Sequence, residues 1–176
     1  MIEKNSADYK EFHNIISDII NHPATQHMKK FKQHYNCTCF DHCLAVSYYS
    51  YKICKHLNLD YTSMARAAML HDLFLYDWRV KQPGRKGFHA FTHPYTAYRR
   101  ASSLFNLNKK EKDIIIKHMW PITIIPPKYA ESFIITLVDK YCALSESYTY
   151  YSEKFVSKKS FRYASILMFM LLVHIP

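Results

Sequence analysis

The chain has 176 residues and a mass of 21.0 kDa, and its composition is 49% hydrophobic and 16% aromatic, which excludes intrinsic disorder and favours one globular domain over 1–176. The net charge of +10 favours an anionic partner, but the basic residues are scattered, so sequence-specific nucleic-acid binding is not expected. Gly84 and Gly87 are the only glycines, which excludes a glycine-rich phosphate loop or dinucleotide fingerprint and favours an all-α fold.

Helix start signals appear early and recur. Ser6 is placed to cap a first helix that runs toward Asn21. Thr38, followed three residues later by Asp41, has the pattern of a capping box and opens a second helix. Asp60 is placed to cap a third helix, which is rich in alanine, methionine and leucine. The first third of the chain is therefore predicted to be helical.

The middle of the chain carries two further signals. Thr92 and Pro94 are predicted to form the cap and first turn of a helix. Asn108 and Glu111 form a capping box, and the helix that they open should end near Pro121, because proline disfavours a helical residue before it.

The last part of the chain is predicted to hold one long and one short helix. The first covers about 128–145, and the aromatic segment 148–151 is predicted to connect it to a final helix that begins near Ser160. The apolar run 164–175 is shorter than the about 20 residues that span a membrane, so no transmembrane span is predicted. Docking or self-association to a homo-oligomer through this run is an open alternative.

The cysteines indicate the cellular compartment. There are five, and no cleavable signal precedes them, so a reducing, cytoplasmic location is predicted. Cys37, Cys39 and Cys43 lie near His34 and His42, which would suit zinc. Because no second pair follows at the spacing of a zinc finger, small buried side chains are the favoured interpretation.

Several ionisable residues occur where a helical core is expected. His71 and Asp72 interrupt the apolar segment AAMLHDLFL, Asp139 interrupts FIITLVDKYCAL, and His118 follows three isoleucines and a lysine. A buried carboxylate without a partner is costly, and Asp139 has only Lys140 as a nearby cation. These residues therefore predict a shared metal centre.

The candidate ligands are His42, His71, Asp72, His93, His118 and Asp139. Four of them suffice for one metal, whereas His93 and His118 would hold a second metal that Asp72 bridges to the first. A mixed histidine and aspartate set suits Fe, Mn, Zn or Co. Two such cations about 3.5–4 Å apart activate a shared water molecule and neutralise phosphate oxygens.

In order and spacing, these six residues resemble the HD-domain superfamily of metal-dependent phosphohydrolases. The gaps from ligand to ligand, counted from Asp72 after the adjacent pair, are 29, 21, 25 and 21 residues. The resemblance covers about 31–145 and implies a compact bundle of five or more helices with the metal centre between them. It leaves 146–176 as a connector and an apolar helix. The segments HDLFLYDWR and KHMWPITIIPPKY are similar to those of small bacterial HD proteins.

The resemblance implies cleavage of a nucleotide or another small phosphate ester by metal-activated water at Asp72, with Asp77 or His89 protonating the leaving group. Several members carry a lysine soon after the HD pair, but this chain has three apolar residues there. Phosphate binding would then fall to the basic residues of the following loop, which also holds both glycines: Arg79, Lys81, Arg85 and Lys86.

Two other functions are alternatives at this stage. Some superfamily members with the same series resemble di-iron oxygenases that cleave C–C or C–P bonds, and both chemistries use the same ligands. The other alternative is a non-catalytic, basic helical module that binds a partner and holds a structural metal.

Overall fold

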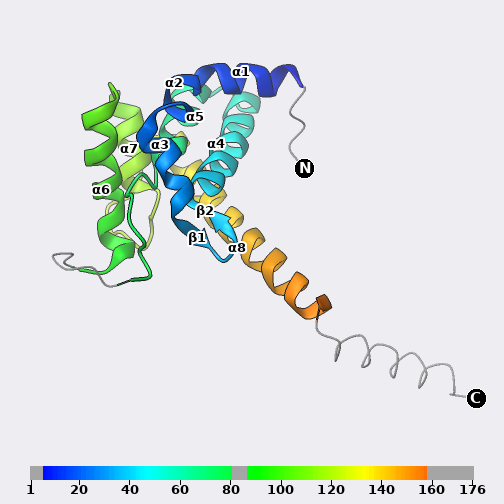
Figure 1. Cartoon of the computed structure of the whole chain (residues 1–176). Helices are drawn as coiled ribbons and strands as arrows, with labels where there is room; N and C mark the ends of the chain where they lie inside the picture. Colours follow the sequence, from blue (N-terminus) through cyan, green and yellow to red (C-terminus); the bar gives the residue numbers. More distant parts are fainter. Residues whose placement is uncertain (1–5, 81–86, 158–176) are drawn as a thin grey trace, which may run out of the picture.

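A computed structural model, which describes residues 6–80 and 87–157, is almost entirely helical and confirms the predicted all-α fold (Figure 1). A two-stranded antiparallel hairpin is its one sheet within the described residues. The elements in chain order are α1 (Ala7–Ile15), α2 (Ser17–Ile20), α3 (Pro23–His27), the 3-10 helix η1 (Met28–Lys30), β1 (Lys32–His34), β2 (Cys37–Thr38), α4 (Cys39–His56), α5 (Tyr61–Leu70), α6 (His89–Leu104), α7 (Lys109–Lys117) and α8 (Ala130–Ser157).

Helices α4 and α5 form the centre of the bundle. Helix α4 packs against α1, α5 and α8, and α5 also packs against α7. The α5 segment is buried along most of its length, and the burial continues into Leu73 and Phe74 after the helix ends. Each methionine, leucine or phenylalanine among these contributes about 1.5–3 kcal/mol when its side chain leaves water. The two polar residues between them, His71 and Asp72, are thereby drawn into the core.

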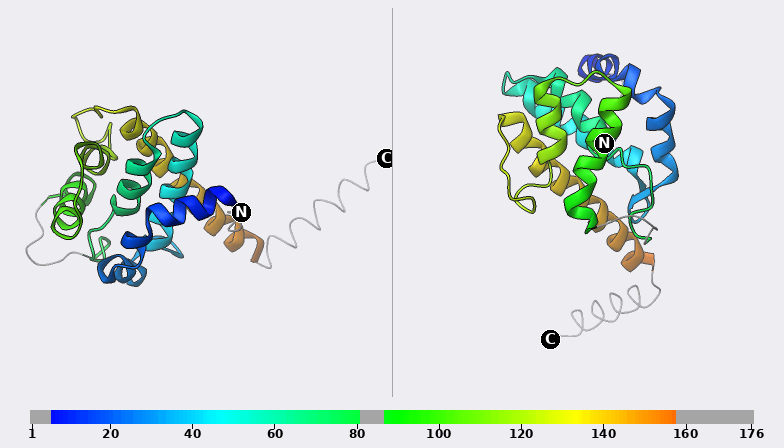
Figure 2. Two further views of the ribbon diagram at one scale, coloured as in Figure 1. Left: turned by 90° about the horizontal axis from the view of Figure 1, so that it is seen from above. Right: turned by 90° about the vertical axis from the view of Figure 1, so that its left-hand side faces the viewer.

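Helices α6 and α7 lie side by side on one flank of the bundle, as both Figure 1 and Figure 2 show. Ile114 and Ile115 anchor α7 to the core. His118 stands at the C-terminal cap of α7, directly after this apolar stretch, and it is buried. The packing of α7 therefore carries His118 toward the centre of the molecule.

Four of the five predicted N-caps are confirmed: Ser6, Thr38, Asp60 and Asn108. The side chains of Ser6, Thr38 and Asp60 each accept a hydrogen bond from the backbone N–H three residues later. Asn108 and Glu111 form the complete reciprocal capping box, in which each side chain accepts from the backbone N–H of the other. Such caps satisfy N–H groups that have no partner within the helix, and each contributes about 1 kcal/mol.

The predicted start of α6 is wrong. The helix begins at His89, and Thr92 lies inside it, where its hydroxyl donates to the Phe88 carbonyl at 3.1 Å. Gly87, with a φ of 80°, makes the turn that precedes the helix, a conformation that other residues rarely adopt. Pro94 therefore sits within the helix, and because it has no N–H it cannot donate to the carbonyl four residues earlier.

Two other boundaries differ from the prediction. The first helix is divided at Ile16 into α1 and α2. Helix α8 begins near the predicted residue but continues to Ser157, so the aromatic segment 148–151 is helical and is not a connector. Tyr35 at the hairpin turn stacks on Tyr150, with ring centroids 4.3 Å apart, and so stabilises this extension.

The far end of α8 projects beyond the bundle (Figure 2). The predicted helix from Ser160 and the apolar run 164–175 lie outside the described residues. Over the part of the chain that the structure describes, no helix has both the length and the apolar character needed to cross a membrane.

Candidate metal centre

The structure brings all six predicted ligands together between five helical segments. Five parts of the bundle contribute them: α4 gives His42, the turn after α5 gives His71 and Asp72, α6 gives His93, the end of α7 gives His118, and α8 gives Asp139. Five of the six are buried, and Asp139 is partly buried. Residues that are far apart in the sequence thus form one polar cluster inside an apolar core.

One half of the cluster joins α4, α5 and α8. His42 Nε2 lies 3.0 Å from Asp139 Oδ1, and His71 Nε2 lies 3.7 Å from the same oxygen. His71 Nε2 is also 3.6 Å from Asp72 Oδ2. Ligand atoms of His42, His71 and Asp72 all lie within 4.8 Å of one another, so one cation can reach them together.

The other half joins the same aspartate to α6 and α7. Asp72 Oδ1 is 3.2 Å from His93 Nε2 and 3.7 Å from His118 Nε2. The two histidine Nε2 atoms are 2.8 Å apart. Asp72 therefore points one carboxylate oxygen at each half, which is the position of a bridging ligand.

Backbone hydrogen bonds fix the orientation of three histidines. The Nδ1 atoms of His71, His93 and His118 each lie 2.7–2.8 Å from a carbonyl oxygen three or four residues earlier in the chain. Since a carbonyl only accepts, each Nδ1 carries the proton and donates it. In the neutral ring, Nε2 then has a lone pair directed at Asp72, as in histidines that bind metal.

Two atoms at the centre have unmet hydrogen-bonding capacity. His71 Nε2 and Asp72 Oδ1 are fully buried and have no hydrogen-bond partner among the described residues. Leaving one such group unsatisfied costs about 1–3 kcal/mol. A divalent cation would satisfy both atoms, and nitrogen and carboxylate donors suit Fe, Mn, Zn or Co. The residues present therefore fit the metal that the ligand series predicts.

Burial and mutual charge set the protonation of the cluster. Burial disfavours the charged form of His118 and lowers its pKa to about 3, with further lowering by His71 and His93. Burial opposes ionisation of Asp72, but the neighbouring histidines outweigh it and hold the pKa of this carboxyl well below its usual value. A neutral His118 and an ionised Asp72 are the forms that bind metal.

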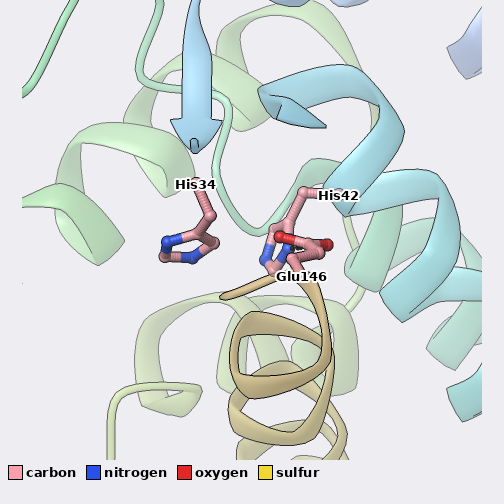
Figure 3. Close-up of side chains that lie close together, drawn as sticks. All are labelled: His34, His42 and Glu146. Atoms are coloured by element: carbon pink, nitrogen blue, oxygen red, sulfur yellow. Dashed lines mark hydrogen bonds and ion pairs between the residues drawn. The ribbon is translucent and has the colours of Figure 1, made fainter. Parts of the chain in front are cut away.

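A fifth histidine and a glutamate, neither of them in the predicted ligand series, flank His42. Figure 3 shows Glu146 and His34 beside His42; Glu146 Oε1 lies 3.0 Å from His42 Nδ1. The rings of His34 and His42 meet edge to face with centroids 5.3 Å apart. Glu146 follows Asp139 by seven residues and thus lies on the same face of α8. That spacing was a usable sequence signal. His34 was noted only for its nearness to the cysteines, and its contact with His42 was not predicted.

Gln33 and Lys140 are two more site residues that the sequence analysis missed in these roles. Gln33 Nε2 donates to Asp72 Oδ2. Lys140 does not pair with Asp139; its Nζ donates to the carbonyls of Thr136 at 3.0 Å and His118 at 3.4 Å. Burial lowers the pKa of Lys140, although the Asp139 charge opposes this.

A cavity of about 300 Å³ opens over the metal centre. Lys140 is the one lysine or arginine among its described lining residues, and His34, Trp78 and Met119 are also part of its wall. His89 lines it too, stacked between Trp78, at 5.4 Å, and His93, at 4.5 Å. The cavity thus presents one cation and aromatic surfaces beside the candidate ligands.

Asp77 and Arg79, two of the residues predicted to transfer a proton or bind phosphate, lie outside this cavity. Asp77 forms a bidentate ion pair with Arg79, at 2.8 and 2.9 Å, and neither residue lines the cavity. This pairing with Arg79 lowers the pKa of Asp77, which makes it a poor proton donor. The other three loop cations, Lys81, Arg85 and Lys86, fall outside the described residues.

Comparison with family models decides the family. A model described as the HD domain matches residues 39–144, more than half of the chain, and the match contains all six candidate ligands. The chain belongs to the HD-domain family. Most HD-domain proteins are metal-dependent phosphohydrolases that bind divalent metals. In this HD-domain protein, Gln33, His34 and Glu146 lie outside the matched segment. Comparisons with curated proteins and with solved structures gave no match.

Proposed function

We propose that this HD-domain protein is a two-metal phosphohydrolase that cleaves a nucleotide or another small phosphate ester. The observation that supports this is the position of Asp72, whose two buried oxygens face separate groups of histidine Nε2 atoms. His42, His71, Asp72 and Asp139 would hold one divalent cation, and Asp72, His93 and His118 the other. When bound, such cations lower the pKa of a water molecule and neutralise phosphate oxygens.

The protein's own residues would hold the substrate in place over this centre. The Lys140 ammonium is fixed by two backbone carbonyls at the edge of the cavity, and it would bind a non-bridging phosphate oxygen. His89 lines the same cavity and replaces Asp77 as the candidate that protonates the leaving-group oxygen. The Trp78 indole gives the cavity an aromatic surface for a base or a similar ring.

The buried surroundings would exclude bulk water and keep the ligands in one geometry. In each neutral ring the carbonyl bond to Nδ1 leaves the lone pair on Nε2, and Gln33 donates to Asp72 Oδ2 from the side of the hairpin. Hydrogen bonds that hold the ligand side chains in place strengthen metal binding. They also keep the charged groups of the site in the positions where they stabilise the transition state.

A hydrolysis screen with metal analysis tests this function. The full-length protein, supplied with Fe, Mn, Zn or Co, is tested on nucleoside phosphates, dinucleoside polyphosphates and simple phosphate monoesters. We expect Asp72→Ala to lose both metals and at least 1,000-fold in kcat/KM, or about 4 kcal/mol of transition-state stabilisation. His56→Ala, at an exposed histidine near the end of α4, is the control and should retain both.

Two outcomes would contradict the proposal. One is an Asp72→Ala protein that has lost its metals and still hydrolyses the substrate. The other is a protein that holds two irons when purified without oxygen, consumes oxygen with a substrate and hydrolyses no phosphate ester; that result would support the oxygenase alternative.

A further inference from the structure

A second and larger cavity, of about 790 Å³, lies between α6, α7 and the residues just before α8. It shares no lining residue with the cavity over the metal centre. Helices α6 and α7, which form its two long sides, lie next to each other in Figure 1 and Figure 2. A volume between about 300 and 1,000 Å³ is typical of sites for small molecules.

The walls of this α6–α7 cavity are strongly basic. Five of its lining residues are cations: Arg99, Lys109, Lys112, Lys117 and Lys128. Across residues 6–80 and 87–157, no carboxylate forms an ion pair with any of them. Several like charges around one hollow repel one another and produce a positive potential that attracts an anion.

The single carboxylate in the wall does not neutralise these charges. Asp113 Oδ2 accepts a hydrogen bond from Ser132 Oγ at 2.8 Å and another from the Lys128 backbone N–H at 2.9 Å. This oxygen therefore serves to join α7 to the start of α8. The ammonium groups of the wall remain available to a ligand.

The same walls carry three tyrosines, Tyr95, Tyr98 and Tyr129. Tyr95 is 45% exposed, so part of its side chain can contact a ligand. The Lys112 ammonium lies 5.1 Å from the centre of the Tyr98 ring, and Lys128 lies 5.6 Å from that of Tyr129. Each pair places a cation and an aromatic face together, and these two groups bind a phosphate and a stacked base, respectively.

We propose that the α6–α7 cavity is a nucleotide-binding site separate from the metal centre. The lysines and Arg99 bind the phosphates, and the tyrosine rings contact the base. The inference goes beyond the proposed reaction and does not depend on it, because no residue of the metal centre takes part.

Calorimetric titration of the full-length Asp72→Asn variant with ADP tests the site, because this change disables the metal centre and leaves the α6–α7 cavity intact. We expect ADP to bind this variant. The double variant K109Q/K112Q should weaken binding to the Asp72→Asn protein at least tenfold, because both lysines are exposed in the wall. K10Q/K30Q, which removes two exposed lysines away from the cavity, is the matched control and should change Kd less than twofold.

A second arm tests the aromatic contact and does not depend on the folding of the lysine variant. ADP should bind at least fivefold more tightly than pyrophosphate, and Tyr95→Leu should remove most of that difference while leaving pyrophosphate binding unchanged. The proposal is overturned if the Asp72→Asn protein binds no ADP, if adding K109Q/K112Q to that protein leaves its ADP binding unchanged, or if pyrophosphate binds as tightly as ADP.

Discussion

The Nε2 atoms of His93 and His118 lie 2.8 Å apart, and each ring donates its Nδ1 proton to a backbone carbonyl. With both rings neutral, two lone pairs face each other at hydrogen-bonding distance without a proton between them, which is repulsive. A cation that both nitrogens bind removes this repulsion. The pair is therefore the strongest single indication that the second half of the cluster is a metal site.

This relationship predicts the effect of His118→Ala on metal content. We expect the wild type to bind two metals per chain and the variant to bind one, because His42, His71, Asp72 and Asp139 remain. Elemental analysis after dialysis measures the ratio, and hydrolysis should fall at least 100-fold. His56→Ala is the control. A His118→Ala protein that still binds two metals would show that this pair is not a ligand pair.

Glu146 is predicted to position His42. Burial opposes a charge on His42, but Asp139 and Glu146 outweigh it and raise its pKa. In the metal-bound form, the Glu146 carboxylate would accept from His42 Nδ1 and leave Nε2 free for the metal. We expect Glu146→Ala to weaken binding of the first metal about 10–100-fold. Glu146→Gln, whose amide oxygen still accepts, should lose much less.

Competition with a coloured chelator measures these affinities, and Glu11→Ala, a glutamate on α1 that is remote from the centre, serves as the control. A purely structural role for Glu146 would lower thermal stability in both variants and leave the affinity of the folded protein unchanged. That result would contradict the positioning role.

Lys140 is predicted to bind substrate phosphate without contributing to metal binding. We expect Lys140→Gln to lower kcat/KM about 10–100-fold, since a charge-assisted hydrogen bond contributes about 1.5–3 kcal/mol. Metal content should stay at the wild-type value, and Lys140→Arg should recover part of the activity. Steady-state kinetics and elemental analysis measure the two effects. Lys10→Gln is the control; loss of metal in Lys140→Gln would contradict this role.

The parts of the fold that were predictable depend on short-range interactions. Caps such as Ser6 and Asp60 join side chains to N–H groups three residues away, so their sequence pattern is sufficient. The start of α6 was not predictable in this way. Thr92 is a residue type that commonly caps helices, but it lies inside a helix that begins earlier, directly after the turn at Gly87.

Four of the candidate ligands stand out in apolar segments: His71, Asp72, His118 and Asp139. His42 and His93 were predicted from the order and spacing of the whole series. Their supporting residues were harder to find, because those contacts cross the fold: Gln33 is 39 residues from Asp72, and Glu146, although its spacing from Asp139 was a signal, is 104 residues from its partner His42. Lys140 has the same limitation, since only the packing of α8 against the end of α7 places its ammonium in the cavity.

Glu131 provides a prediction for stability that is independent of the metal. This 3% exposed residue in the first turn of α8 accepts from the Asp60 backbone N–H at 3.0 Å and from Lys110 Nζ at 2.7 Å. Burial opposes its ionisation, but these donors outweigh burial and lower its pKa. A lowered pKa in the folded state stabilises the protein above the unfolded-state pKa of about 4.5, and this contribution disappears as the pH falls below it.

We therefore expect Glu131→Gln to cost about 2 kcal/mol at pH 7, because it weakens two hydrogen bonds to a buried carboxylate. The difference from the wild type should shrink between pH 5 and pH 3. Urea unfolding of both proteins with a chelator present measures it, and Asp18→Asn, at a carboxylate that is 55% exposed, should cost less than about 1 kcal/mol. An equal difference at pH 7 and pH 3 would mean that Glu131 stabilises the junction of α5, α7 and α8 by its shape and not by its charge.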